Sequence, residues 1–346
     1  MASDPALRLS GAAAPSPFVF VVGCPRSGTT LLQRMLDAHP ALAVANDTHF
    51  IARAMQAVLP ALANGSADEI PPGQQRALID WACAYHRFAR LKLPDAAVSR
   101  AAQAETFPAF VSAIYRELAA MHGKVLGGEK TPDYVRSLPL LHRLFPDAKV
   151  LHIVRDGRDV ALSALEWAHA GKGPGRFALW QEQPLAVCAL WWRWQVGSGR
   201  KAAASLPPGV LLELRYETLV HDARGELERV AEFLGIGQAD AMLGFHEGKT
   251  RSGAQLSAKS AWLPPTAGLR DFSNHMTPAE QALFELLAGD LLQELGYPSV
   301  APQAELERPE TLALADRCRQ AWEQELALGS RRKDERAARA IQELQP

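Results

Sequence analysis

The sequence predicts an α/β fold of three layers, in which helices cover a central, mostly parallel β-sheet. Two runs, residues 18–22 and 148–154, are almost continuously apolar, as in strands buried on both faces of a parallel sheet. Residues 210–216 indicate a third strand, and helical spacing of apolar residues follows each of the three runs. With 346 residues, the chain is long enough for one large domain with additions.

The N-terminal part of the chain divides into a flexible start, a strand–helix unit and a helical insertion. Residues 1–17 are expected to be flexible, and the α/β domain is expected to occupy residues 18–300. A helix is predicted from Leu31, and another from Asp47 or Thr48 to Leu59. Because no strand signal separates the helices that follow, residues 60–123 are predicted to form a helical insertion beside the sheet. Its main helices are expected near residues 74–91 and 107–121.

The remainder of the chain alternates strands and helices before a charged tail. Residues 124–133 indicate a short strand that ends in a polar loop. Further helices are predicted at residues 134–144, from Asp156, and at 185–201, 223–234 and 278–295. The tryptophans of residues 185–201 are interpreted as core, with a stacking platform for a base as the alternative. Residues 249–271 are predicted to be a loop, and 301–346 a charged helical extension through which copies of the chain could associate.

Composition excludes several classes of protein. A net charge of -1 carries no overall nucleic-acid signature. The four cysteines are scattered and form neither a disulfide framework nor a zinc pattern, so no metal is expected. No apolar run approaches the length of about 20 residues that spans a membrane, and the first residues lack the apolar segment of a signal peptide. A cytoplasmic protein without a membrane or nucleic-acid partner is therefore expected.

The turn after the first strand predicts an anion site. Its frame, Gly23-x-x-x-x-Gly28-Thr29-Thr30, is that of the nucleotide-binding P-loop, but Thr29 stands where the P-loop has lysine. Backbone N–H groups and the positive end of a helix dipole converge in such a turn. Positive charge comes instead from Arg26, whose planar fork can hold a phosphate bidentately. The missing lysine argues against cleavage of a nucleoside triphosphate.

A second anion site is predicted at the end of another strand. Arg155 follows the strand at 148–154, and Ser163 lies about two helical turns further on, on the same helix face. In open α/β sheets ligands bind beyond the carboxyl ends of the strands, so both polar turns should face one crevice. The alternative for Arg155 is an ion pair with Asp156 or Asp159. A ligand with two separated phosphates would satisfy both sites.

These motifs together resemble those of sulfotransferases that use 3′-phosphoadenylyl sulfate (PAPS), and most closely the tyrosylprotein branch. The similarity lies in residues 25–30 (PRSGTT), 35–40 (MLDAHP), 154–159 (VRDGRD), 213–220 (ELRYETLV) and 233–236 (FLGI). It extends over roughly residues 18–272. The resemblance implies a P-loop-like α/β fold and transfer of the sulfuryl group of PAPS to a hydroxyl or amine, with the product PAP and without a metal.

The resemblance also implies which residues bind PAPS. It assigns the 5′-phosphosulfate to Arg26, Ser27, Gly28, Thr29 and Thr30, and the 3′-phosphate to Arg155 and Ser163. Tyr216 is expected near the adenine, and Ser252 and Arg270 are expected to close over the cofactor. Where the family has a second arginine after the 3′-phosphate serine, this chain has Trp167, so that contact is absent or comes from elsewhere.

The resemblance extends to the groups that carry the chemistry. Lys130, in the segment 128–132 (GEKTP), matches the lysine that assists departure of the leaving phosphate; pairing with Glu129 or Asp133 is the alternative. The tyrosylprotein branch has a catalytic glutamate where this chain has Asp47. His49 is the rival for the role of base, because imidazole has the better-matched ordinary pKa.

A PAPS-dependent sulfotransferase is the leading functional hypothesis. The alternatives are a P-loop nucleotide kinase, disfavoured by Thr29, and a nucleotide-binding protein without catalysis whose tail binds a partner. The acceptor is open between a small molecule, a carbohydrate and a peptide, and the insertion at 60–123 is expected on the acceptor side.

Overall fold

The computed structural model describes residues 18–63, 69–169, 171–237, 240–247 and 271–343, and side chains as far as residue 331. The expectations for residues 1–17, for Ser252 and for Arg270 therefore lie outside the described residues.

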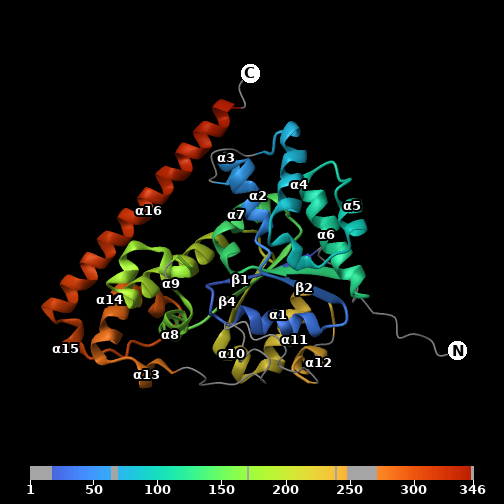
Figure 1. Cartoon of the computed structure of the whole chain (residues 1–346). Helices are drawn as coiled ribbons and strands as arrows, with labels where there is room; N and C mark the ends of the chain where they lie inside the picture. The colour runs from blue at the N-terminus through green and yellow to red at the C-terminus, as the bar shows by residue number, and fades with distance from the viewer. Residues whose placement is uncertain (1–17, 64–68, 170, 238–239, 248–270, 344–346) are drawn as a thin grey trace.

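Five parallel strands form the central sheet (Figure 1). Their bounds are β1 Phe18–Gly23, β2 Leu42–Asn46, β3 Leu126–Lys130, β4 Lys149–Val154 and β5 Leu211–Arg215, and their spatial order is β2-β3-β1-β4-β5. Every pairing is parallel, so the carboxyl ends of all five strands lie at one edge. The predicted α/β fold with a parallel sheet is confirmed. Strand β2 was not predicted, and the helix expected from Asp47 or Thr48 begins only at Phe50.

Helices connect the strands and cover the sheet. Their bounds are α1 Thr29–Ala38, α2 Phe50–Val58, α3 Pro60–Ala63, α4 Gln75–Ala84, α5 Asp95–Ala101, α6 Phe107–Met121, α7 Leu138–Leu144, α8 Gly157–Trp167, α9 Pro184–Ala203, α10 Tyr216–His221, α11 Ala223–Leu234, α12 Asp240–Leu243, α13 Phe272–His275, α14 Pro278–Glu294, α15 Gln303–Leu306 and α16 Pro309–Glu343. Short 3₁₀ helices are η1 Pro72–Gln74, η2 Phe88–Leu91, η3 Pro132–Ser137, η4 Gly173–Arg176 and η5 Ala178–Gln181. Part of the helix predicted at 134–144 is thus 3₁₀.

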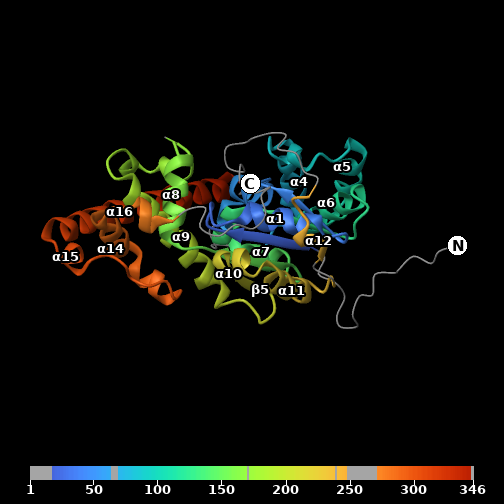
Figure 2. The same cartoon turned by 90° about the horizontal axis from the view of Figure 1, so that it is seen from below.

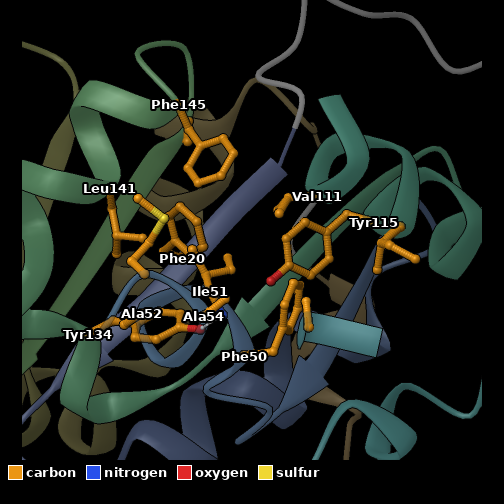
Figure 3. Packing of buried hydrophobic residues seen from close by; sticks show 14 of the residues in the cluster. Phe20, Phe50, Ile51, Ala52, Ala54, Val111, Tyr115, Tyr134, Leu141 and Phe145 are labelled. Atoms are coloured by element: carbon orange, nitrogen blue, oxygen red, sulfur yellow. Dashed lines mark hydrogen bonds between the residues drawn. The ribbon is translucent and has the colours of Figure 1, made fainter. Parts of the chain in front are cut away.

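Alternation along β1 divides the core between the two faces of the sheet. Phe18, Phe20 and Val22 pack with α2, α4, α6 and α7 on one face, where Phe20 lies near Phe145 (Figure 3). Val19 and Val21 face the opposite way, toward α1, α11 and α12. The two helical layers lie above and below the sheet in Figure 1. The three-layer arrangement follows directly from an apolar strand that is buried on both sides.

A third apolar cluster joins α8, α9, α14 and the first half of α16 at one side of the sheet (Figure 2). Trp191 and Trp192 of α9 are 1% and 0% exposed, which confirms the interpretation as core for these two, whereas Trp194 is only partly buried and packs against the cluster. Ala315, Cys318 and Trp322 bury one face of α16 in the same cluster. Helix α16 continues past this cluster to α3 (Figure 1). The charged extension is therefore anchored to the body of the protein.

Within the described residues, no helix has the length and apolarity needed to cross a membrane.

Candidate active site

The turn between β1 and α1 is shaped to expose backbone N–H groups. The Ser27 N–H donates to the Cys24 carbonyl oxygen at 3.1 Å, and Gly28 adopts a φ of 92° before α1 begins at Thr29, two residues earlier than predicted. No side chain among the described residues caps the first turn of α1. Arg26 itself has a φ of 82°, a conformation that a residue with a side chain rarely adopts. This combination leaves the start of α1 available to an anion.

Tyr216, the first residue after β5, closes one side of this turn. A Cβ atom on Gly28 would collide with the Tyr216 ring, so only glycine allows the ring to lie against the turn. The Arg155 guanidinium stacks on the same ring, 4.3 Å from its centroid. Three sequence-predicted residues from three separate segments therefore meet at one aromatic ring.

The two predicted anion sites are in direct contact. Arg26 Nε donates to Ser163 Oγ at 2.8 Å, which joins the turn after β1 to helix α8 after β4. Arg155 Nη2 pairs with Asp159 Oδ2 at 3.0 Å, so the ion pair that the sequence offered as an alternative does form. Ser27 Oγ and Arg155 Nε are buried and have no hydrogen-bond partner within the described residues. Trp167 stands under Arg26, with the guanidinium carbon 5.9 Å from its ring.

Arg158 holds the segment that carries Arg155. Its guanidinium pairs with Asp156 at 2.7 Å and with Glu285 of α14 at 2.9 Å, and it is 1% exposed. The Asp156 carboxylate also accepts the Arg158 backbone N–H at 2.9 Å, which caps α8. The start of α8 is thereby fixed to α14.

Lys130 and Asp47 form a pair at the ends of adjacent strands. Lys130 Nζ lies 3.1 Å from Asp47 Oδ2, and the lysine is 2% exposed. Parallel pairing of β2 with β3 brings Asn46 beside Lys130, and the Asp47 N–H donates to the Lys130 carbonyl oxygen at 2.8 Å. Burial lowers the pKa of Lys130, and the negative charge of Asp47 opposes that shift. Lys130 therefore pairs with Asp47 rather than with the predicted alternatives, Glu129 or Asp133.

Asp47 and His49 lie in a strained turn between β2 and α2. Their φ values are 54° and 59°, and no hydrogen bond of a side chain caps α2 at His49. The sequence predicted the helix to begin at Asp47 or Thr48, and the structure places the N-cap of α2 at His49 instead. Among the described residues, Arg26, Asp47 and His49 are three of the four non-glycine residues with positive φ. Such strain concentrates at functional sites, where the surrounding structure must hold it.

Glu129 is the group that holds this turn, and sequence reasoning missed it. Its Oε1 accepts the backbone N–H groups of Thr48 and His49, both at 3.1 Å. The hydroxyl groups of Thr48, Thr131 and Tyr115 also donate to the carboxylate, which is 0% exposed. Burial raises the pKa of Glu129, while these hydrogen bonds act in the opposite direction. The only signal in the sequence is its position next to Lys130, because glutamate is rarely buried.

His49 is neutral at neutral pH. Loss of hydration lowers its pKa to about 4, although Asp133 and Asp47 attract a proton to the ring. An imidazole with so low a pKa is a weak general base. The structure places both candidate bases, Asp47 and His49, in one turn.

A cavity of about 440 Å³ adjoins His49. It is bounded by α2, η3, η4, α9 and α16, and its wall includes Tyr134, Phe177 and Trp194. The donor-side residues Arg26 and Arg155 do not line it. Elsewhere in the described ranges, no group of three His, Cys, Asp or Glu side chains is arranged to hold a metal ion.

Comparison with known proteins gives the family. A family model described as "Sulfotransferase family" matches residues 17–240. The chain belongs to the sulfotransferase family. A sulfotransferase domain from the curacin biosynthetic pathway has the same fold, with a TM-score of 0.51 and 19% identity over 84% of this chain and 100% of that domain.

Curated relatives of this sulfotransferase are named protein-tyrosine sulfotransferases. Protein-tyrosine sulfotransferase A of Caenorhabditis elegans is 27% identical over 66% of this chain and 52% of its own length. Protein-tyrosine sulfotransferase 1 of Homo sapiens is 33% identical over 41% of this chain and 32% of its own length. The chain thus matches about half or less of these two relatives. The predicted family and enzyme class are confirmed, and the kinase alternative is not favoured.

Proposed function

We propose that this sulfotransferase moves the sulfuryl group of PAPS to an acceptor hydroxyl, with Asp47 and Lys130 as its catalytic residues. The observation that carries the proposal is the hydrogen bond from Arg26 Nε to Ser163 Oγ at 2.8 Å. It joins the segments to which the 5′ and 3′ ends of the donor are assigned. An amine acceptor is compatible with the same chemistry.

The residues present fit the donor. The uncapped start of α1 offers N–H groups, and the side chains of Arg26 and Arg155 supply positive charge beside it. Arg155 Nε, buried without a partner in the described part of the chain, can donate to a phosphate oxygen. Ser27, Thr29 and Thr30 complete the turn, and we assign Tyr216 to the side of the adenine. Bound PAPS supplies the activated sulfuryl group.

The chain itself supplies the proton acceptor and the cation. Asp47 Oδ2 takes the proton of the acceptor hydroxyl, and Lys130 stabilises negative charge that develops on the leaving phosphate. In the structure these two charges hold each other at 3.1 Å. Burial lowers the pKa of Lys130, and the ion pair with Asp47 acts against that shift and favours the cationic form. His49 supports the turn in its neutral form and is the second candidate for the base.

A hydroxyl acceptor is consistent with the curated relatives, whose names state action on protein tyrosine. The cytoplasmic location and self-association through α16 are further parts of the proposal. Cell fractionation tests the first, and sedimentation of the purified chain tests the second.

Calorimetric titration with PAP tests the donor site. We expect the wild-type chain to bind PAP and the double variant Arg26→Ala plus Arg155→Ala to lose at least about a hundredfold in affinity, because two charged hydrogen-bond donors are removed. Arg224→Ala, which removes an exposed arginine paired with Asp240, is the matched control and should bind as the wild type does. Wild-type chain that fails to bind PAP, or a double variant that binds normally, would reject the proposal. Tighter binding of ATP with Mg²⁺ than of PAP would restore the kinase hypothesis.

A further inference from the structure

The cavity beside His49 has the size of a small-molecule site. Its volume of about 440 Å³ lies within the range of about 300–1000 Å³ that is typical of such sites. Phe177, Trp194 and Tyr134 provide aromatic surface, while Arg53, Arg136 and Arg176 provide charge. Aromatic walls with a few charged groups favour a ligand that has a flat apolar body and a polar end.

His49 connects this cavity to the catalytic pair. The His49 ring belongs to the cavity wall, and the charges of both Asp133 and Asp47 act on it. Asp133 lines the cavity, whereas Asp47 pairs with Lys130. Asp47 lies two residues before His49 in the same turn, so a hydroxyl group at the His49 end of the cavity lies next to the turn that carries the proposed base. This is the position that an acceptor must take for transfer.

Arg176 is a cation without a counter-ion. Its guanidinium carbon lies 4.9 Å from the Phe177 ring and 5.8 Å from the Trp194 ring, and no described carboxylate is within ion-pair distance. Loss of hydration lowers the pKa of Arg176, and the positive charge of Arg136 adds to this effect. The negative charge of Asp133 opposes this shift in the pKa of Arg176, and the positive charge of Arg53 adds to it. An anion placed here would relieve the repulsion between these cations.

Of the two carboxylates of the cavity, Asp133 is ion-paired and Glu325 accepts one backbone hydrogen bond. Asp133 accepts from Arg136 at 3.0 Å and from Gln195 at 2.9 Å. Glu325 accepts the Ala178 backbone N–H at 2.7 Å. The charge of Glu325 is paired with no described cation, and its Oε2 is buried without a partner in the described part of the chain. The three arginines of the cavity therefore exceed its two carboxylates by one positive charge, which favours an anionic ligand near Arg176.

Helix α16 forms the outer wall of the cavity. Leu326, Gly329 and Ser330 line it, and the ring of Trp322 lies 4.3 Å from that of Phe177. The bond from Ala178 to Glu325 ties η5 to the same helix. Figure 1 shows α16 passing this side of the molecule between α14 and α3. Helix α16 therefore covers one side of the cavity.

We propose that this cavity binds the acceptor, that α16 bounds it, and that the acceptor is a small phenolic acid whose anionic group pairs with Arg176. The inference rests on the proposed function and adds its substrate class. It makes an internal segment of a protein the less favoured acceptor, because α16 occupies one side of the cavity along which a continuous peptide would otherwise run.

The test measures binding to the PAP-saturated protein, so it does not depend on turnover. The probes are 4-hydroxyphenylpropionate, its primary amide, and a ten-residue peptide with a central tyrosine. We expect the acid to bind at least about tenfold more tightly than the amide or the peptide, because only the acid forms a charged hydrogen bond. Arg176→Ala should remove this preference. Arg193→Ala, which alters an exposed arginine paired with Asp290, should keep it.

A second variant tests the wall. A Cβ on Gly329 meets no atom within 4 Å, so Gly329→Phe can extend into the cavity without disturbing the core. It should weaken the acid at least about tenfold and leave PAP affinity unchanged. Any of four results would overturn the inference. The acid and the amide could bind equally, the peptide could bind more tightly than the acid, no probe could bind to the PAP complex, or Gly329→Phe could bind the acid as the wild type does. Failure of the wild type to bind PAP would instead reject the proposed function, so the two failures are distinct.

Discussion

Replacing Glu129 with alanine should release the turn that carries Asp47 and His49. The Glu129 carboxylate accepts two backbone N–H groups at 3.1 Å, those of Thr48 and His49. The hydroxyl groups that also donate to it can rotate to other acceptors, but the backbone groups cannot. A buried donor without a partner costs about 1–3 kcal/mol, so two of them predict a loss of about 2–6 kcal/mol in the free energy of unfolding.

Urea denaturation measures this loss, and PAP titration shows whether the turn after β1 stays intact. Glu129→Gln keeps an oxygen for the two N–H groups and can turn its amide toward the Tyr115 hydroxyl, so it should cost less than about 1.5 kcal/mol. In the alanine variant turnover should fall while PAP affinity stays near that of the wild type, because the hydrogen bonds described for Glu129 run to the turn between β2 and α2, to Thr131 and to Tyr115. A loss below about 1 kcal/mol for alanine, or equal losses for alanine and glutamine, would refute the role given to Glu129.

Three further predictions concern the other site residues. The pKa of His49 is about 4 in the folded chain, below the ordinary 6.5, so between these pH values the unfolded chain binds a proton that the folded chain does not bind. The free energy of unfolding of the wild type should therefore rise by up to about 3 kcal/mol from pH 4 to 6.5 and then level off. Denaturation of His49→Gln should lack that rise. Gly28→Ala should lower both stability and PAP affinity, because Gly28 has a φ of 92° and a Cβ there would collide with Tyr216. The control Gly123→Ala has a φ of 66° but its Cβ would meet no atom, so thermal denaturation should show only the cost of backbone strain, about 1 kcal/mol. Lys130→Met should slow PAP formation by about 100–1000-fold with an acceptor in excess, and a smaller effect than tenfold would remove Lys130 from the chemistry.

Most of the sheet could be predicted because its strands are apolar on both faces. Strands β1 and β4 are nearly continuous runs of this kind, and α11 ends at Gly235 as predicted. Strand β2 escaped notice because three of its five residues are not large β-formers, and a short run of this composition does not differ from a helix by periodicity. Its burial comes from pairing with β3, which is distant in sequence.

Site residues that belong to a sequence motif could be predicted, whereas site residues whose partners are set by tertiary packing could not. The turn at Arg26 and the pairing partner Ser163 follow from spacing along two segments, and the structure brings them together. The partner of Lys130 depends instead on which strands are neighbours, so sequence proximity suggested Glu129 while the sheet supplies Asp47. The contribution of α16 to the cavity wall also depends on a tertiary contact, so it could not be predicted from the charged composition of the C-terminal tail.

The strand order found in the sheet gives the proposed chemistry a linear layout. Read along the carboxyl edge from β2 to β5, the strands lead to Asp47, Lys130, Arg26, Arg155 and Tyr216 in turn. In the proposed roles these are the proton acceptor, the leaving-group cation, the two phosphate sites and the adenine side. Neighbouring strands are about 4.8 Å apart, so four intervals form a ruler of about 19 Å. Helices inserted between the strands can change without altering these distances between the proposed functional residues. A different acceptor then requires changes only near the end of β2, where the proposed proton acceptor lies.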